Sequence, residues 1–169
     1  MRVVPVCLLP LLLLAGCELY GKIGGNDTNI QGAMPELLRG EWAFPLDHPS
    51  ERYVIEANTI EYGYGGGESA YNFIGHIRFV SNFSANSGVI FIEYIKPPSF
   101  ENHNGNFFSA IYYRNLTNNT VQLANVINLA DLRSADAASL EEAVAKFTRR
   151  RMGNYVNWSV VQPQWRVHQ

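Results

Sequence analysis

Short runs of β-favouring residues, repeated at near-regular spacing after Pro35, constrain the fold of this chain more than any other feature. The runs are rich in Val, Ile, Tyr and Phe, which favour strands, and Gly, Pro, Asn and Ser, which favour turns, separate them. They lie at positions 41–44, 53–57, 59–64, 71–80, 89–96, 107–116, 121–128 and 158–161. The pattern predicts a mainly β domain of about eight short strands.

Two features of these runs predict local structure, a bent strand and a hairpin. The run 71–80 alternates apolar and polar residues and has Gly75 in its interior, which predicts a strand that bends as barrel strands do. The runs 107–116 and 121–128 are joined through Asn118 and Asn119, which favour a turn. These two runs form the clearest predicted hairpin of the chain.

One helix interrupts the strand pattern before the last run. Ser139 followed by Glu142 forms a capping box, the signature of a helix start. Apolar residues then recur at helical spacing on one narrow face, at Leu140, Ala143, Val144 and Phe147. Arginines at 149–151 suit the negative end of the helix dipole, and Gly153 predicts the helix end. We expect this helix to lie against the outside or the mouth of a sheet, because its apolar face is narrow.

The number of runs and the return strand after the helix favour a closed sheet. Closure removes the two unpaired edges that an open sheet of these strands would leave exposed. We therefore predict an antiparallel up-and-down barrel of about eight strands, with one amphipathic helix before the last strand.

The sequence Gly40-Glu41-Trp42 resembles the Gly-x-Trp that opens the first strand of lipocalins. In that family an arginine near the last strand packs over the tryptophan, and Arg166 is the counterpart by position. The resemblance implies a lipocalin-like barrel over residues 35–169, with structural roles for Trp42 and Arg166. One difference is that lipocalins place their helix after the last strand, whereas a strand is predicted after the helix here.

Residues 1–16 have the composition of an export signal. Arg2 supplies the positive charge, and the apolar run 3–14 contains six leucines. That run is about 12 residues long, well short of the ~20 that a membrane-spanning helix needs. We therefore predict a signal peptide at 1–16.

The sequence Leu14-Ala15-Gly16-Cys17 directly after this run is similar to the lipobox of bacterial lipoproteins. The resemblance implies cleavage before Cys17, a diacylglycerol thioether on its sulfur and acylation of the freed amine. Glu18 stands where some bacteria read Asp as an inner-membrane retention signal, which favours the outer membrane. The alternative is a plain secretory signal followed by an accidental cysteine. The face of the membrane that the domain occupies is left open.

Residues 17–34 are rich in Gly and Asn and lack periodicity, so we predict a lipidated, flexible tether. An N-terminal arm packed on the domain is the alternative. The two cysteines of the chain, Cys7 and Cys17, lie in the signal and at the predicted lipid site. The rest of the chain therefore has no thiol for a disulfide, a metal cluster or a nucleophile.

Composition and motifs argue against several functional classes. A formal net charge of −2 is too small to indicate a nucleic-acid-binding protein. The sequence has no nucleophile elbow, His-Glu-x-x-His pair, phosphate-binding loop or calcium loop. Its histidines, at 48, 76, 103 and 168, do not have the spacing of metal ligands. We expect a non-enzymatic protein without a cofactor or a metal.

Three polar residues stand inside apolar strand runs: Glu93, Arg114 and Asn125. A buried charge is costly unless it is paired, so these side chains face solvent, form structural pairs or orient the polar head of a ligand. Tyr112 joins them as a candidate ligand-binding residue. Tyrosine-rich strands line a cavity when the rings face into a barrel, or make an adhesive face when they point outwards.

The leading hypothesis is a membrane-anchored lipoprotein of the bacterial cell envelope whose barrel binds or carries a small apolar ligand. The alternative is a cell-surface adhesion or protein-interaction module that uses the barrel exterior and its loops. The predicted partners are thus the membrane, through the lipid on Cys17, together with a small apolar ligand or a protein.

Overall fold

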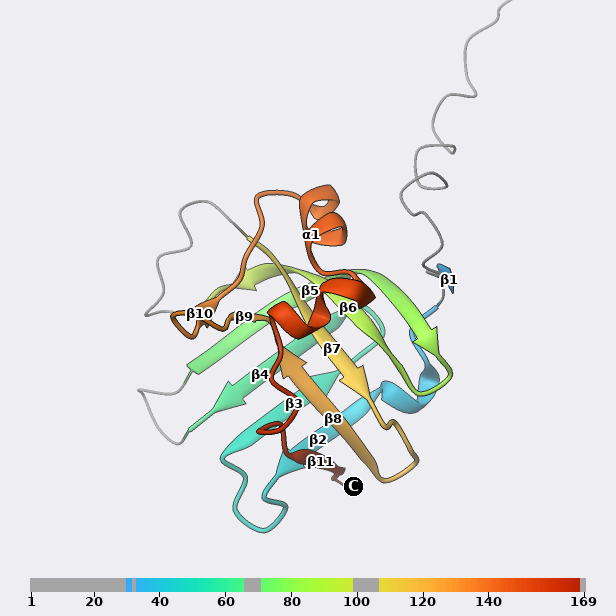
Figure 1. Ribbon diagram of the computed structural model, residues 1–169. Coiled ribbons are helices and arrows are strands. Elements are labelled where there is room, and N and C mark those ends of the chain that lie inside the picture. Colours follow the sequence, from blue (N-terminus) through green and yellow to red (C-terminus); the bar gives the residue numbers. More distant parts are fainter. Residues whose placement is uncertain (1–29, 32, 66–70, 99–106, 168–169) are drawn as a thin grey trace, which may run out of the picture.

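The computed structural model describes residues 30–31, 33–65, 71–98 and 107–167, which contain a complete barrel (Figure 1). The predicted signal at 1–16 and the predicted lipidation residue Cys17 lie outside the described residues, and so does most of the predicted tether.

Eight strands build the wall of the barrel. They are β2 (Gly40–Phe44), β3 (Glu51–Ile55), β4 (Thr59–Tyr64), β5 (Tyr71–Ser84), β6 (Ser87–Lys96), β7 (Phe108–Arg114), β8 (Thr120–Asn125) and β11 (Pro163–Arg166). The shorter strands are β1 (Ile30–Gln31), β9 (Ile127–Asn128) and β10 (Arg133–Ser134). The helical segments are η2 (Glu36–Leu38), α1 (Leu140–Lys146) and η3 (Arg149–Asn154), of which η2 and η3 are 3-10 helices.

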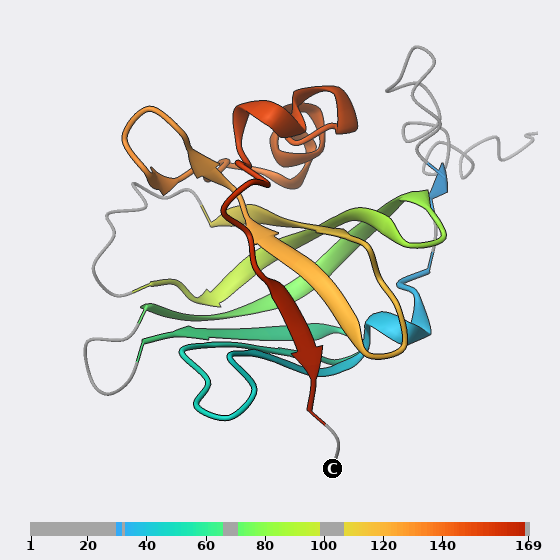
Figure 2. The same ribbon diagram turned by 60° about the horizontal axis from the view of Figure 1, so that its bottom comes forward.

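Each strand of the wall pairs antiparallel with the next strand along the chain. β8 pairs with β11, and β11 pairs with β2, so the sheet closes on itself. Figure 2 shows β11, in dark red, lying beside β8 below the helical segments. The predicted fold is confirmed: the chain forms a closed, up-and-down, lipocalin-like barrel of eight antiparallel strands with its helix before the last strand.

Two apolar clusters lie on opposite sides of the barrel wall. The interior cluster includes Leu38, Trp42, Tyr53, Ile55, Ile60, Phe73, Ile90, Ile92, Ile111, Tyr113, Val121 and Leu123. The exterior cluster packs Val89, Phe91, Ala110, Tyr112, Ala124 and Val126 of the wall against Ala143, Phe147 and Val156. The helical segments therefore cover one outer side of the barrel, which explains why strands β6 and β7 are apolar on both faces.

The strand pairing agrees with two predictions, the hairpin and the irregularity at Gly75. Strands β7 and β8 form the expected hairpin, in which Tyr113 lies opposite Leu123. Gly75 lies at a register shift between β5 and β6, where a bend was expected. A Cβ atom on Gly75 would lie 3.2 Å from the Cβ atom of Ile92, so the bulge brings the two strands too close for a larger residue.

The predicted last strand is wrong in its position. Residues 158–160 form a turn, Val161 belongs to no strand, and β11 begins instead at Pro163. Proline lacks the N–H that a strand ladder needs, so it is not expected inside a strand. It is tolerated as the first residue of a strand, and Pro163 occupies that position.

The predicted helix begins where expected and ends early. The Ser139 hydroxyl accepts a hydrogen bond from the backbone N–H of Glu142, and the Glu142 carboxylate accepts one from the N–H of Ala138. Helix α1 then ends at Lys146. The arginines at 149–151 and Gly153 belong to the separate 3-10 helix η3 rather than to α1.

The last residues of the predicted tether are attached to the barrel. Ile30 lies opposite Asn82 and Gln31 lies opposite Ser81 in a short pairing of β1 with β5. Met34 is buried in the interior cluster. From Ile30 onwards, the described residues therefore form a packed N-terminal arm.

Candidate ligand cavity

One end of the barrel is closed by a tryptophan and an arginine. The indole N–H of Trp42, which is fully buried, donates to the backbone oxygen of Leu38 at 2.9 Å. The guanidinium of Arg166 lies 4.2 Å from the centre of the Trp42 ring, which is the contact implied by the resemblance to lipocalins. It also donates to three backbone oxygens, those of Leu37, Arg39 and Asn118.

A cavity of about 390 Å³ lies at the opposite end, where β2, β4 and β8 end and β3 begins. The buried side chains of the interior cluster, among them Trp42, Ile55 and Ile60, pack the barrel between this cavity and the closed end. Its walls are mostly apolar and aromatic, and include Phe44, Tyr53, Tyr62, Tyr64, Leu123, Ile127, Tyr155, Val156, Val160 and Val161. Most ligand sites are concave spaces of roughly 300–1,000 Å³ with such walls, so this cavity has the size of a small-molecule site.

A carboxylate faces this cavity. Glu51 Oε2 accepts a hydrogen bond of 2.6 Å from Nε2 of Gln164, a residue with no exposed surface. Glu51 Oε1 accepts from the hydroxyls of Tyr62, at 3.2 Å, and Tyr53, at 3.5 Å. Burial raises the pKa of Glu51 above its ordinary value, and these three hydrogen bonds oppose the effect without cancelling it.

In the part of the chain that the structure describes, the Glu51 carboxylate has no cation beside it, and two buried oxygens at this end of the barrel accept no hydrogen bond. Among the described residues Glu51 has no ion pair, whereas Glu41 pairs with Arg52 and Glu93 pairs with Arg78. In the same part of the chain, Asn125 Oδ1 and Gln164 Oε1 are buried without a hydrogen-bond partner. Such atoms carry a desolvation penalty that native proteins rarely leave in place without a reason.

One wall of the cavity is a strap, residues 155–162, which links η3 to β11. The N–H of Ile127 donates to the backbone oxygen of Tyr155 at 3.1 Å, and Nε2 of Gln122 donates to that of Val161 at 2.7 Å. The guanidinium of Arg114 lies 4.1 Å from the centre of the Trp158 ring. These contacts attach the strap to the outer face of the barrel.

Of the four predicted ligand-binding residues, only Asn125 lines the cavity. Glu93 is on the outer face, where Arg78 Nε donates to its carboxylate at 2.6 Å. Arg114 is also on the outer face and holds the strap.

Tyr112 is buried in the exterior cluster, where its hydroxyl donates to the backbone oxygen of Thr148 at 3.1 Å. Burial raises its pKa well above the usual range of a tyrosine. Tyr112 therefore attaches the helical segments to the barrel and does not contact the cavity.

The sequence interpretation missed Glu51 and Gln164. Glu51 precedes Tyr53 by two residues and so shares its face, but the predicted strand began at 53. Gln164 follows Pro163, where the last strand was predicted to have ended. Strict two-residue alternation, extended one step beyond each predicted strand, would have found Glu51.

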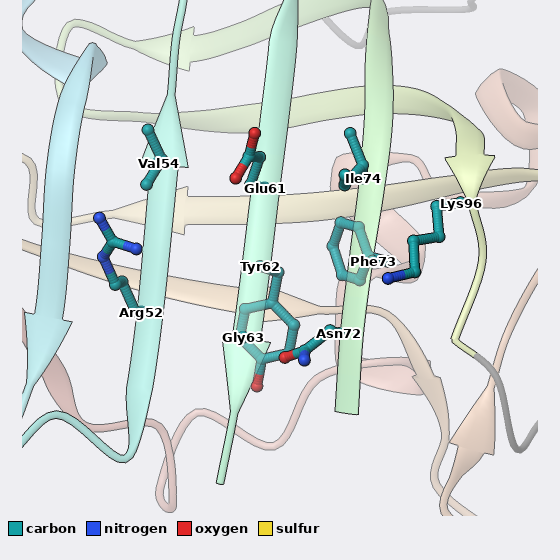
Figure 3. A pocket seen from close by; sticks show the side chains of 9 residues that line it. All are labelled: Arg52, Val54, Glu61, Tyr62, Gly63, Asn72, Phe73, Ile74 and Lys96. Carbon is teal, nitrogen blue, oxygen red and sulfur yellow. The ribbon is translucent and has the colours of Figure 1, made fainter. Parts of the chain in front are cut away.

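A second, smaller hollow of about 260 Å³ lies on the outer face of strands β3 to β5 (Figure 3). Arg52, Glu61 and Asn72 line it together with Lys96 at the end of β6. Gly63 leaves the space open, since a Cβ atom there would lie 3.0 Å from Asn72 Oδ1. Its charged rim and position outside the barrel distinguish it from the apolar cavity at the mouth.

No family model, curated protein or solved structure matches this chain, so its function is argued from its own residues. Among the residues that the structure describes, no helix is long and apolar enough to cross a membrane. In the same residues no three His, Cys, Asp or Glu side chains gather as a metal site would require.

Proposed function

We propose that this chain is a bacterial lipoprotein, anchored in the outer membrane through Cys17, whose barrel binds or carries a small apolar molecule without transforming it. The cavity at the barrel mouth carries this proposal. An eight-stranded barrel has an interior just wide enough for side chains or for one small ligand. Here side chains fill one end and the middle, and the open end has room for the ligand.

The lining supports binding of an apolar molecule. Aliphatic side chains from the strap and aromatic rings from β2, β3 and β4 surround the space, while few polar groups reach it. Burying the apolar surface of a ligand against such walls contributes roughly 25 cal/mol per Å². The few polar groups, Glu51 and Asn125 among them, would fix its orientation.

The ligand proposal is tested by filling the cavity. The full chain is purified in one non-ionic detergent as wild type, as Val161→Trp and as Val54→Trp. Val161 lines the cavity and Val54 lines the outer hollow, and both are half-buried. Each protein is titrated with the neutral fluorescent probe phenylnaphthylamine, and circular dichroism checks that each is folded.

We expect saturable binding to the wild type and to Val54→Trp, and at least about tenfold weaker binding to Val161→Trp, because a bulky ring occupies the ligand's space. Equal binding by all three proteins would contradict the proposal, since the probe would then report on detergent or on the outer surface.

The anchor proposal has a separate test. Each lipid methylene that enters a membrane contributes about 0.8 kcal/mol, and two or more chains hold a protein there stably. The Cys17→Ser chain should therefore leave the membrane fraction of expressing cells, while the wild type stays in it. A Cys17→Ser product that remains in the membrane fraction would contradict lipidation at this residue.

A further inference from the structure

Two buried oxygens near the barrel mouth accept no hydrogen bond from the described residues, whereas the unpartnered indole N–H of Trp158 belongs to a residue outside the cavity lining. Asn125 is a residue of the cavity lining, and its Oδ1 and the Oε1 of Gln164 are buried without a partner in the described part of the chain. The carboxylate of Glu51 accepts hydrogen bonds from three neutral groups. A ligand that satisfies this set must bring donors.

The Glu51 carboxylate at the barrel mouth also lacks a cationic partner among the described residues. Glu51 carries a full negative charge when ionised, and the nearest cation in sequence, Arg52, points outwards to Glu41 at 2.7 Å. Arg166 is engaged at the closed end over Trp42. A buried carboxylate without a cation is unfavourable, and a cation on the ligand would remove that penalty.

The aromatic lining adds a third, independent observation. The rings of Tyr53 and Tyr62 lie 4.5 Å apart beside the carboxylate, and Tyr64 and Tyr155 also line the cavity. The faces of such rings attract cations, and clusters of them recognise ammonium groups. Anions would meet the carboxylate, the unpaired oxygens and the ring faces together, and all three repel negative charge.

We propose that the ligand is an apolar amine, a compact hydrocarbon or aromatic body whose protonated amino group binds at Glu51 with its apolar part against the strap. This inference deepens the proposed carrier function and rests on it. Among the described residues, the acceptor oxygens, the Glu51 carboxylate and the tyrosine ring faces all favour a protonated amino group. The apolar walls favour the hydrocarbon part of the ligand.

The test compares three eight-carbon compounds that differ only in their head group: octylamine, octanol and octanoate. Each competes with phenylnaphthylamine for the full chain in the same detergent at pH 7, where an alkyl amine is protonated. Three proteins are compared: wild type, Glu51→Gln, which keeps the shape and removes the charge, and Glu41→Gln, the same change on the outer face.

We expect the wild type and Glu41→Gln to bind octylamine at least about tenfold more tightly than octanol, and octanoate most weakly, since a charge-assisted hydrogen bond is worth that much or more. In Glu51→Gln the advantage of octylamine should fall to about threefold or less, while the probe still binds. Because the wild-type series alone measures the preference, the test does not depend on the folding of a variant.

Two results would overturn the inference: octanoate bound by the wild type as tightly as octylamine, or an unchanged octylamine advantage in Glu51→Gln. Either leaves the carrier function standing if the probe binds. Absence of any probe binding to the wild type would instead overturn the carrier function itself.

Discussion

The two ends of the barrel differ in how they surround a half-buried charged side chain. At the closed end, the guanidinium of Arg166 lies over Trp42 and donates to three backbone oxygens. At the open end, the Glu51 carboxylate receives only neutral donors, and the Asn125 oxygen lacks a donor among the described residues. At the closed end the protein itself supplies the acceptors for the cation, whereas at the open end a ligand could supply the cation that the carboxylate lacks.

This difference indicates that the closed end stabilises the fold, whereas the carboxylate at the open end lowers the free energy of unfolding. A cation that lies on an aromatic ring and donates to three backbone oxygens stabilises the barrel. A carboxylate buried without a cation lowers stability, and proteins retain such groups mainly at functional sites. We therefore predict that substitutions at the closed end reduce stability and that substitutions at the open end alter binding.

The largest expected effect comes from removing the tryptophan of the closed end. Trp42→Ala should lower the free energy of unfolding by about 3–5 kcal/mol, because it leaves a large cavity in a fully buried site. Urea unfolding followed by circular dichroism measures the loss. The control is Trp165→Ala, at a site 44 % exposed on the neighbouring strand β11, where a loss of about 1 kcal/mol is expected. Similar losses in both variants would contradict the role of the closed end.

A smaller effect should follow from releasing the strap. Arg114→Ala removes the cation–ring contact with Trp158 and a hydrogen bond of 2.9 Å to Gln122, for a loss of about 1–2 kcal/mol. Hydrogen exchange at the N–H of Ile127, which is bonded to the strap, should accelerate, and phenylnaphthylamine should bind more weakly.

The control for the strap is Arg78→Ala, which breaks the half-exposed ion pair with Glu93 elsewhere on the outer face. A surface ion pair of this kind contributes about 0–1 kcal/mol, and its loss should leave probe binding unchanged. Weaker probe binding in Arg78→Ala to the same extent would show that the strap contacts of Arg114 are not responsible.

The smallest expected effect is a pH dependence of opposite sign at two carboxylates on neighbouring strands. Both have an ordinary pKa of 4.5. Burial raises the pKa of Glu51, so the folded state holds its proton more tightly, and stability falls as pH rises above 4.5. The hydrogen bond from Arg52 lowers the pKa of Glu41, so stability is lost as pH falls below 4.5.

Urea unfolding between pH 3 and pH 7 checks these signs. Relative to Glu51→Gln, the wild type should lose stability with rising pH above 4.5, and relative to Glu41→Gln it should gain stability with rising pH below 4.5. A wild type that gains stability over Glu51→Gln as pH rises above 4.5 would show that this carboxylate is paired in solution.

Local sequence patterns predicted most of the fold and little of the site. Strand spacing and the capping box at Ser139 act over a few residues, so both could be read from the chain. The polar cluster depends on closure of the barrel, which brings Gln164 against Glu51 across 113 positions. No local pattern signals that contact, and Pro163 concealed the strand that provides it.

The predicted ligand-binding residues that lie on the outer face also show how local patterns fail to locate the site. Glu93 and Arg114 were singled out as polar residues in apolar runs, but the helical segments make part of the outer face apolar as well. A polar residue in such a run therefore does not show which face is the interior. Asn125 was singled out on the same ground, and it lines the cavity because β8 ends at this residue, at the mouth of the barrel.

The contrast between the two ends is tested most directly by hydrogen exchange of the full chain with and without saturating phenylnaphthylamine. The account predicts slower exchange at the mouth, at the N–H of Ile127 that is bonded to Tyr155. It predicts no change at the closed end, at the N–H groups of Arg166 and Val167 that are bonded to Asn119 and Glu41. Protection confined to the closed end, or equal at both ends, would contradict it.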